Sequence, residues 1–240
     1  MGSRTADFEM HTDPSEKMSP ALIGAAIAAM VLVFAVLLFA PAGRLSWGLG
    51  WAYVGIVTAH VTINWVCLLR WNPELIARRM RIGEGTKAWD KIWAVWFTPV
   101  MVAVYVVAGL EAREGVSSSV GATWLLGLAI FLPGSALVTW SMTVNPFFEK
   151  TVRIQRDRGH RVIDSGPYAY VRHPGYAGFT GWIISAPLLL ESSWAFVPAL
   201  FAVVGIVIRT VLEDHTLRAE LSGYPEYAAR VRFRLIPGVW

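Results

Sequence analysis

The chain has 240 residues, of which 55% are hydrophobic and 16% are charged, and its formal net charge is +4. A soluble domain carries about 25% charged residues, so the composition excludes an ordinary soluble globular protein. The single cysteine, Cys67, excludes an intrachain disulfide and argues against a cysteine-based zinc site. Several apolar runs have the length of roughly 20 residues that a membrane-spanning helix needs. The composition therefore predicts an all-α, polytopic integral membrane helical bundle.

The N-terminal half divides into a polar tail and four apolar runs. Residues 1–19 are polar and of mixed charge, which predicts a short disordered tail. The first apolar run is too long for a signal peptide and lacks a convincing cleavage site, so we expect a retained span. Residues 20–141 are predicted to form four transmembrane helices, at about 20–40, 47–69, 92–110 and 121–141.

Residues 142–240 have a different pattern, in which a polar loop precedes a tight apolar pair at about 177–190 and 194–211. The first member of the pair is short and contains Pro187, so it fits either a full crossing or a re-entrant helix. The prediction is therefore five to six spans that end in a helical hairpin. Beyond the hairpin, Gly223 and Pro225 interrupt the helix.

The last residues predict a short interfacial helix. Tyr227, Val231 and Phe233 form an apolar side among arginines. Such a pattern favours a segment that lies on the membrane surface or against the 142–175 loop.

Basic residues indicate how the spans are oriented. They gather in the 70–91 loop, the 142–175 loop and the tail after residue 212, whereas the opposite connections contain only Arg44 and Arg113. Basic loops mark the cytoplasmic side, and six crossings put all three basic segments and both termini on that side. We expect anionic lipid headgroups, and not nucleic acid, as the partner of these loops in so hydrophobic a chain.

The segment RIQRDRGHRVIDSGPYAYVRHPGYAG, residues 153–178, is polar and basic although it lies between long hydrophobic helices. Gly166-Pro167 and Pro174-Gly175 are turn signals. Glycine lets a backbone approach a ligand closely, and aromatic rings can stack on a flat base or face a cation. Arginines and tyrosines are also common membrane-surface anchors. These residues by themselves leave a functional role and an anchoring role equally open.

Ionisable residues stand at the end of the last apolar run, where they are costly and become candidates for function. Arg209 precedes Glu213 by four residues, so the two share a helix face, although this order is the less favourable one for a structural ion pair. His60 and Asn64 share a face of the second predicted span. Hydrogen bonding between helices is favoured there over lining a ligand route. Tryptophans near the span ends predict an interfacial belt, which includes Trp47, Trp51, Trp65, Trp71, Trp89, Trp93 and Trp96.

Together these motifs resemble a known family. GPYAYVRHPGYAG, preceded by GHRV and followed by Arg-x-x-x-Glu, resembles the isoprenylcysteine carboxyl methyltransferases and the wider superfamily of membrane methyltransferases, which includes phospholipid N-methyltransferases. The ending GYPEYAARVRFRLIPG is similar to the usual close of that family. The resemblance is specific over about 145–240. Relatives often have consecutive glutamates where this chain has Glu213-Asp214.

The resemblance implies S-adenosylmethionine as the cofactor, held between a cytoplasmic loop and the last two helices, with 142–240 as the catalytic region. It implies that Arg209 positions the acceptor and that Glu213 binds the ribose hydroxyls or the amino group of the cofactor. An upstream polar contact falls on Gln155 or Arg153, and no metal is expected. The implied cofactor-binding residues are Gln155, His160, Arg161, Val162, Ile163, Tyr168, His173, Pro174, Gly175, Tyr176 and Glu213.

Methyl transfer from a sulfonium mainly needs alignment and exclusion of water. A carboxylate acceptor needs no base and could be held by Arg209, whereas a thiol or amine must lose a proton, for which His173 and His215 are candidates. The expected acceptor is membrane-partitioned or small and apolar, with an isoprenylcysteine-type carboxylate implied by the resemblance.

Alternatives stay open at this stage. Within the same class they are S-methylation of a small thiol and N-methylation of a lipid amine. From another class, a sterol-reductase-like, NADPH-dependent membrane reductase shares a similar Arg-His-Pro pattern. The expected location is a bacterial inner membrane, and the sequence does not give the oligomeric state.

Overall fold

The computed structural model describes residues 19–81, 83–115 and 120–240, so the predicted tail over 1–19 lies outside the described residues except for Ser19. Every regular element in the described residues is an α-helix or a 3₁₀ helix, which confirms the predicted all-α class. Two short 3₁₀ turns, Arg156–Arg158 and Gly166–Ala169, punctuate the loop after α5. The α-helices are α1 (Pro20–Ala42), α2 (Gly48–Trp71), α3 (Pro73–Arg79), α4 (Ala88–Arg113), α5 (Ala122–Val144), α6 (Pro174–Leu189), α7 (Phe196–Glu220) and α8 (Tyr224–Arg230).

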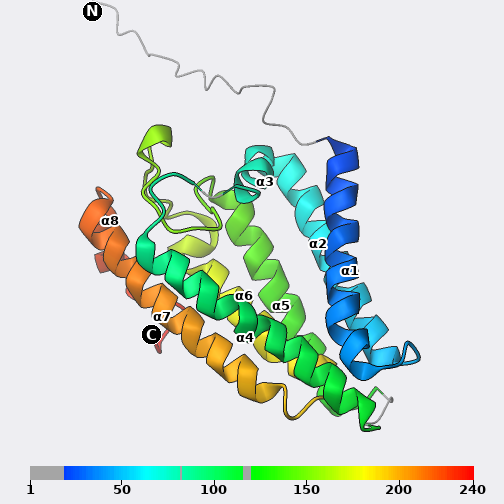
Figure 1. Cartoon of the computed structure of the whole chain (residues 1–240). Helices are drawn as coiled ribbons and strands as arrows, with labels where there is room; N and C mark the ends of the chain where they lie inside the picture. The colour runs from blue at the N-terminus through cyan, green and yellow to red at the C-terminus, as the bar shows by residue number, and fades with distance from the viewer. Residues whose placement is uncertain (1–18, 82, 116–119) are drawn as a thin grey trace, which may run out of the picture.

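Among the described residues, five helices are long and apolar enough to cross a membrane: α1, α2, α4, α5 and α7. The sixth, α6, has 16 residues, fewer than the roughly 20 that a full crossing needs. The count agrees with the predicted five to six spans. In Figure 1 the long helices run between two ends of the molecule, with α3, the 145–173 loop and α8 at one end and the 43–47 and 190–195 turns at the other.

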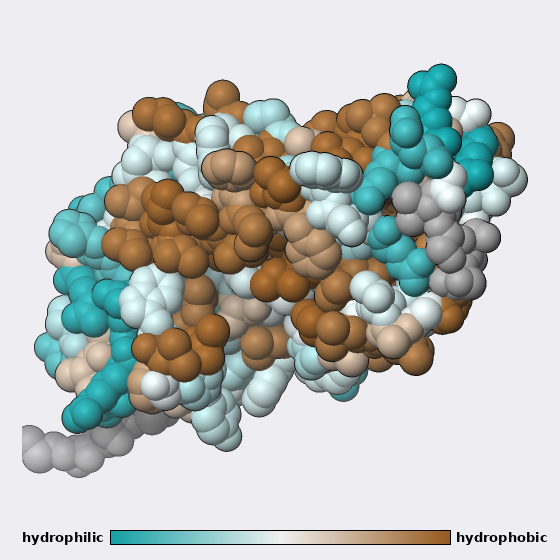
Figure 2. Space-filling view, turned by 90° about the horizontal axis from the view of Figure 1, so that it is seen from below, coloured by the Kyte–Doolittle hydropathy of each residue, from teal (hydrophilic) through white to brown (hydrophobic). Residues whose placement is uncertain are grey.

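The outer surface of the bundle is apolar. Exposed side chains such as Ile63 of α2, Val95 of α4 and Leu200 of α7 face away from the core. Seen from below, hydrophobic side chains cover much of the middle of the molecule, and hydrophilic side chains gather toward its two opposite ends (Figure 2). A contiguous apolar surface between polar ends is what a helical bundle in lipid presents.

Helices α5 and α6 approach so closely that their backbones touch. A Cβ atom on Gly178 would lie 2.5 Å from the carbonyl oxygen of Gly134, and one on Gly134 would lie 2.8 Å from the carbonyl oxygen of Gly178. Small residues at such a crossing let two membrane helices pack without side chains between them. The contact places the start of α6, with His173 and Tyr176, beside the end of α5.

Polar side chains inside the bundle follow the prediction for α2. Asn64 Nδ2 donates to Thr139 Oγ1 at 3.1 Å and contacts Met142 Sδ at 3.5 Å, which joins α2 to α5 by hydrogen bonding. The ring of His60 packs against Phe131 and Trp182.

The tryptophan belt is correct only in part. Trp51, Trp71 and Trp96 are exposed, as an interfacial belt requires. Trp47 is 2% exposed, because it packs under Phe39, and its assignment to the belt was wrong.

The chain after α7 folds back against the loop that follows α5. Tyr227 of α8 is buried, and its hydroxyl donates to the carbonyl oxygen of Tyr168 at 2.7 Å. The backbone N–H groups of Arg172 and His173 donate to the carbonyl oxygens of Phe233 and Arg234 at 3.0 and 2.9 Å. Of the two placements left open by the sequence, contact with the loop is the one observed.

Candidate active site

A cavity of about 600 Å³ opens at the polar end of the bundle, between the 145–173 loop and helices α4, α5, α6 and α7. Its volume falls within the roughly 300–1,000 Å³ typical of small-molecule sites. Arg209 and every residue that the resemblance assigns to the cofactor line it, except Pro174. Pro174 is instead the first residue of α6, where its fixed φ suits the start of a helix, so its assignment as a contact is corrected.

Gln155 and His160 shape the loop wall of the cavity. Gln155 is 2% exposed, and its amide is already engaged: Nε2 donates to the carbonyl oxygen of Phe147 at 2.8 Å, and Oε1 accepts from Arg158 at 2.8 Å. The backbone N–H of Gln155 donates to His160 Nδ1 at 3.3 Å, and the His160 ring lies against Phe147. The Gln155 side chain thus supports the loop, while Arg153, the alternative at this position, also lines the cavity.

The imidazole of His160 is neutral at physiological pH. Burial, and after it the positive charges of Arg153 and Arg158, lower its pKa to about 4 against the smaller opposing effects of Glu149 and Asp157. The residues that follow, Val162 and Ile163, line the cavity in a non-helical stretch. Within the described part of the chain, no hydrogen bond from their backbone N–H groups is recorded, so these donors can meet a ligand.

Tyr168 and Gly175 come from the two turn signals. The Tyr168 hydroxyl accepts from Asn145 Nδ2 at 3.0 Å, and burial raises the pKa of this phenol, which keeps it a neutral hydroxyl. A Cβ on Gly175 would lie 2.4 Å from the ring of Phe148. Gly175 is therefore required for packing Phe148 against the start of α6, whereas the sequence suggested close approach to a ligand.

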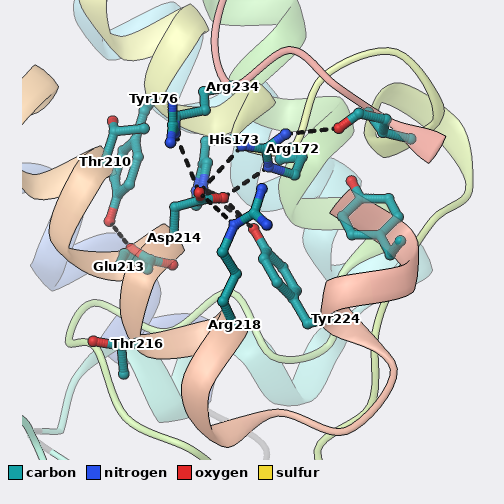
Figure 3. A network of polar contacts seen from close by, with 12 residues as sticks. Arg172, His173, Tyr176, Thr210, Glu213, Asp214, Thr216, Arg218, Tyr224 and Arg234 are labelled. Atoms are coloured by element: carbon teal, nitrogen blue, oxygen red, sulfur yellow. Dashed lines mark hydrogen bonds and ion pairs between the residues drawn. The ribbon is translucent and has the colours of Figure 1, made fainter. Parts of the chain in front are cut away.

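The α7 side of the cavity carries Glu213 and Tyr176 side by side. The hydroxyl of Tyr176 donates to a carboxylate oxygen of Glu213, and the Tyr176 ring stacks on that of His173 with 5.8 Å between centroids (Figure 3). His173, Tyr176 and Glu213 therefore form one wall, as the family motif implies. His215 is exposed and does not line the cavity, so the structure removes it as a candidate base.

Arg209 is more constrained than the sequence indicated. Its Nε lies 2.9 Å from Oδ1 of Asp90, its NH2 donates to the carbonyl oxygen of Lys150 at 2.8 Å, and its guanidinium sits 4.2 Å above the ring of Trp93. Asp90 is 1% exposed and also accepts from the backbone N–H of Val152. The charge of Arg209 is thus compensated by Asp90, although the planar guanidinium still faces the cavity.

Asp90 and Trp93 were not recognised from the sequence. Trp93 was assigned to the interfacial belt, and the structure corrects this because its ring lines the cavity and carries Arg209. The two lie on α4, far along the chain from the loop motif. A Trp-Asp pair at the start of a predicted span was the available signal, and it does not specify which later residue the pair will meet.

A second buried carboxylate, Asp214, joins the cavity wall to the C-terminal tail (Figure 3). It accepts from Arg172 Nε at 2.7 Å and from the Tyr224 hydroxyl at 3.0 Å, and His173 Nε2 lies 3.4 Å away. Arg218 and Arg234 add contacts at 3.1 and 3.2 Å. The NH1 group of Arg172 also donates to the carbonyl oxygens of residues 231 and 232. Asp214 therefore links His173, which lines the cavity, to the arginines and the tyrosine of the C-terminal region.

Known proteins resemble this chain in sequence and in fold. The profile of the isoprenylcysteine carboxyl methyltransferase (ICMT) family matches residues 119–219. Protein-S-isoprenylcysteine O-methyltransferase B of Arabidopsis thaliana is 31% identical over 110 residues, which cover 44% of this chain and 55% of that protein. The Schizosaccharomyces pombe protein-S-isoprenylcysteine O-methyltransferase is 37% identical over 65 residues, covering 27% of this chain and 26% of that protein.

A solved structure supports the same relationship at the level of the fold. The eukaryotic intramembrane Ras methyltransferase ICMT aligns with a TM-score of 0.65 and 18% identity over 90% of this chain and 76% of that one. The chain spans about half the length of the plant relative it matches. The profile and the relatives show that part of the chain, residues 119–219 in the case of the profile, is similar to the isoprenylcysteine carboxyl methyltransferase family, and the solved structure shows that this multi-pass integral membrane protein shares its fold.

Proposed function

We propose that the chain is an S-adenosylmethionine-dependent membrane methyltransferase whose acceptor is a membrane-partitioned carboxylate of the isoprenylcysteine type. One observation carries the proposal. A single cavity at the polar end of the bundle collects His160–Ile163, Tyr168, the His173–Tyr176 segment and the α7 pair of Arg209 and Glu213. The relatives are named protein-S-isoprenylcysteine O-methyltransferases.

The residues of the cavity fit S-adenosylmethionine, which supplies a methyl group activated by a sulfonium. Glu213 offers carboxylate oxygens to hydroxyl or ammonium groups, and the backbone N–H groups of Val162 and Ile163, which have no hydrogen bond to the described residues, offer donors. Aromatic side chains line the cavity, and rings of this kind can pack against a base or a cation. The apolar walls around them exclude water, which methyl transfer requires.

A carboxylate acceptor makes no demand on the histidines of the cavity, whereas a thiol or an amine must lose a proton. His160 Nδ1 is engaged by the Gln155 backbone, and His173 Nε2 faces Asp214 and Tyr224 rather than open space. A base would therefore have to use the other nitrogen of one of these rings, Nε2 of His160 or Nδ1 of His173. Arg209 instead presents a planar group that can align a carboxylate without proton transfer.

The proposal is tested by labelled methyl transfer from S-adenosylmethionine to N-acetyl-S-farnesylcysteine in detergent-purified protein. We expect the label to appear as a base-labile methyl ester, and the pre-formed ester to accept none. Label in a small thiol or in phosphatidylethanolamine would favour S- or N-methylation. Binding of a reduced nicotinamide, without binding of S-adenosylhomocysteine, would favour the reductase.

We also propose that the protein lies in the inner membrane of a bacterial cell and that the cavity opens on the cytoplasmic side. The three basic segments lie at the cavity end of the bundle, whereas the turn after α1 and the end of α4, which contain Arg44 and Arg113, lie at the opposite end (Figure 1). Basic loops favour the cytoplasmic side and attract anionic lipid headgroups.

A further inference from the structure

The cavity holds an arginine that neither the family motif nor the proposed mechanism uses. Arg79, the last residue of α3, lines the cavity at its α3 side. Its NH1 donates to the carbonyl oxygen of Phe148 at 3.1 Å, and its guanidinium lies 5.4 Å from the centre of the Phe148 ring. Within the described ranges, no carboxylate is recorded within ion-pair distance of Arg79.

The other partly or fully buried arginines of the cavity all have a carboxylate beside them. Arg209 lies 2.9 Å from Asp90, and Arg172 lies 2.7 Å from Asp214. Arg153 lies 2.8 Å from Glu149 and from Asp157 in the same way. Arg79 is therefore the exception within the described part of the cavity.

The surroundings of Arg79 oppose its positive charge. Burial and, to a smaller extent, the positive charge of Arg209 lower the pKa of Arg79 to about 10. Arg79, Arg209 and Tyr176 all line the same cavity. A buried charge without a counter-ion is costly, and an anionic ligand would remove that cost.

We propose that Arg79 binds a carboxylate group of a ligand in this cavity. A guanidinium with most of its five N–H donors unengaged matches a carboxylate in a two-pronged contact. This inference rests on the proposed function, which brings two carboxylates to the cavity: that of the methionine end of S-adenosylmethionine and that of the acceptor. Arg209, whose charge is balanced by Asp90, then aligns the acceptor, and the positive charge of Arg79 balances the negative charge of the ligand carboxylate.

The test compares Arg79→Gln and Arg79→Lys with Arg81→Gln, a matched loss of one positive charge at an exposed position of the same segment. Binding of S-adenosylhomocysteine and of its analogue without the carboxylate is measured by calorimetry. Binding of N-acetyl-S-farnesylcysteine and of its methyl ester is measured in the presence of S-adenosylhomocysteine. Thermal unfolding checks that each variant is folded.

Each source of the carboxylate gives its own pattern. If Arg79 binds the carboxylate of the cofactor, Arg79→Gln lowers the affinity for S-adenosylhomocysteine about 10- to 100-fold and leaves the affinity for the analogue unchanged. If Arg79 binds the carboxylate of the acceptor, Arg79→Gln lowers the affinity for the acid by a similar factor and leaves the affinity for the ester unchanged. In either case Arg79→Lys keeps part of the preference for the ligand that has the carboxylate, because lysine keeps the positive charge but lacks the paired N–H donors of the guanidinium.

The outcomes separate this inference from the proposed function. Equal behaviour of Arg79→Gln and Arg81→Gln toward all four ligands would overturn the role of Arg79 and leave the proposed function standing. If the wild-type chain binds neither S-adenosylhomocysteine nor the farnesylated acid, both the function and the inference are wrong.

Discussion

Asp214 is a buried carboxylate that connects one wall of the cavity to the C-terminal tail. Its side chain contacts Arg172, Arg218, Arg234 and Tyr224 at 2.7 to 3.2 Å. Arg172 reaches this carboxylate from the segment before α6. The stability of the loop and the placement of His173 therefore depend on the same residue.

Replacing this carboxylate is expected to be costly. Asp214→Asn leaves the buried guanidinium of Arg172 without a counter-charge, and breaking a buried pair costs about 3–5 kcal/mol of stability. Arg218→Ala, which removes a half-exposed partner of the same carboxylate, should cost about 0–1 kcal/mol. Thermal unfolding in detergent measures both, and equal losses would show that Asp214 is not the organising group.

Arg209 is expected to act on the rate at saturating acceptor. Arg209→Ala removes a charge-assisted contact and should lower that rate about 10- to 100-fold, because this contact is worth roughly 1.5–3 kcal/mol. Arg209→Lys should retain part of the rate. Steady-state kinetics with N-acetyl-S-farnesylcysteine are the measurement, and an unchanged rate at saturation would exclude a positioning role for Arg209.

His160 should make stability depend on pH. Its pKa is about 4 in the folded chain and near 6.5 when unfolded. Between these values the unfolded chain binds the extra proton, so stability falls as the pH drops from about 6.5 toward 4. The melting temperature of the wild type should fall more steeply over this window than that of His160→Gln. His215→Gln, at an exposed position, serves as the control and should follow the wild type.

At the scale of elements, the crossing of α5 and α6 fixes the position of the cavity wall. Gly134 and Gly178 let the two backbones touch, and this brings the start of α6, which directly follows His173, against α5. The sequence predicted both helices and noted the shortness of α6. It did not indicate the crossing, since a glycine in an apolar run is equally consistent with several neighbours.

A methyl group at this crossing should disrupt it. Gly178→Ala puts a Cβ 2.5 Å from the carbonyl oxygen of Gly134, and overpacking of this kind costs about 1–3 kcal/mol. Gly55→Ala on α2 is the matched control, because nothing lies within 4 Å of its Cβ. There the higher helix propensity of alanine should leave stability unchanged or slightly raised. Unfolding midpoints of the two variants would contradict this account if Gly178→Ala were the more stable.

The whole molecule places its polar chemistry at one end of an apolar bundle. The basic segments, the cavity and α8 share that end, while the turn between α6 and α7 lies at the other (Figure 1). At the far turn, Glu111 of α4 accepts from the Ser192 hydroxyl and from the backbone N–H of Trp194. This contact closes the hairpin away from the site.

The proposed orientation can be checked by labelling single cysteines. In a Cys67→Ala background, we expect Glu226→Cys to react with a membrane-impermeant maleimide only after the cytoplasmic side is opened. Ser193→Cys should react in intact cells whose outer membrane has been permeabilised. Both positions are exposed in the structure. The reverse pattern would invert the orientation, and labelling of both positions from one side would contradict the arrangement of the bundle.

The sequence by itself determined the class of protein, the helices and most of the cavity wall. Long apolar runs can satisfy their backbone hydrogen bonds in lipid only as helices, and the motif from His160 to Tyr176 is nearly continuous in the chain. Only the tertiary structure decided which distant groups meet that motif. Asp90, Trp93 and Arg79 reach the cavity through helix packing, and the pairing of Arg209 with Asp90 follows from a contact between α4 and α7. Hydropathy sets the length of a span but not its neighbours, because lipid-facing helices look alike until small residues and buried charges choose their partners.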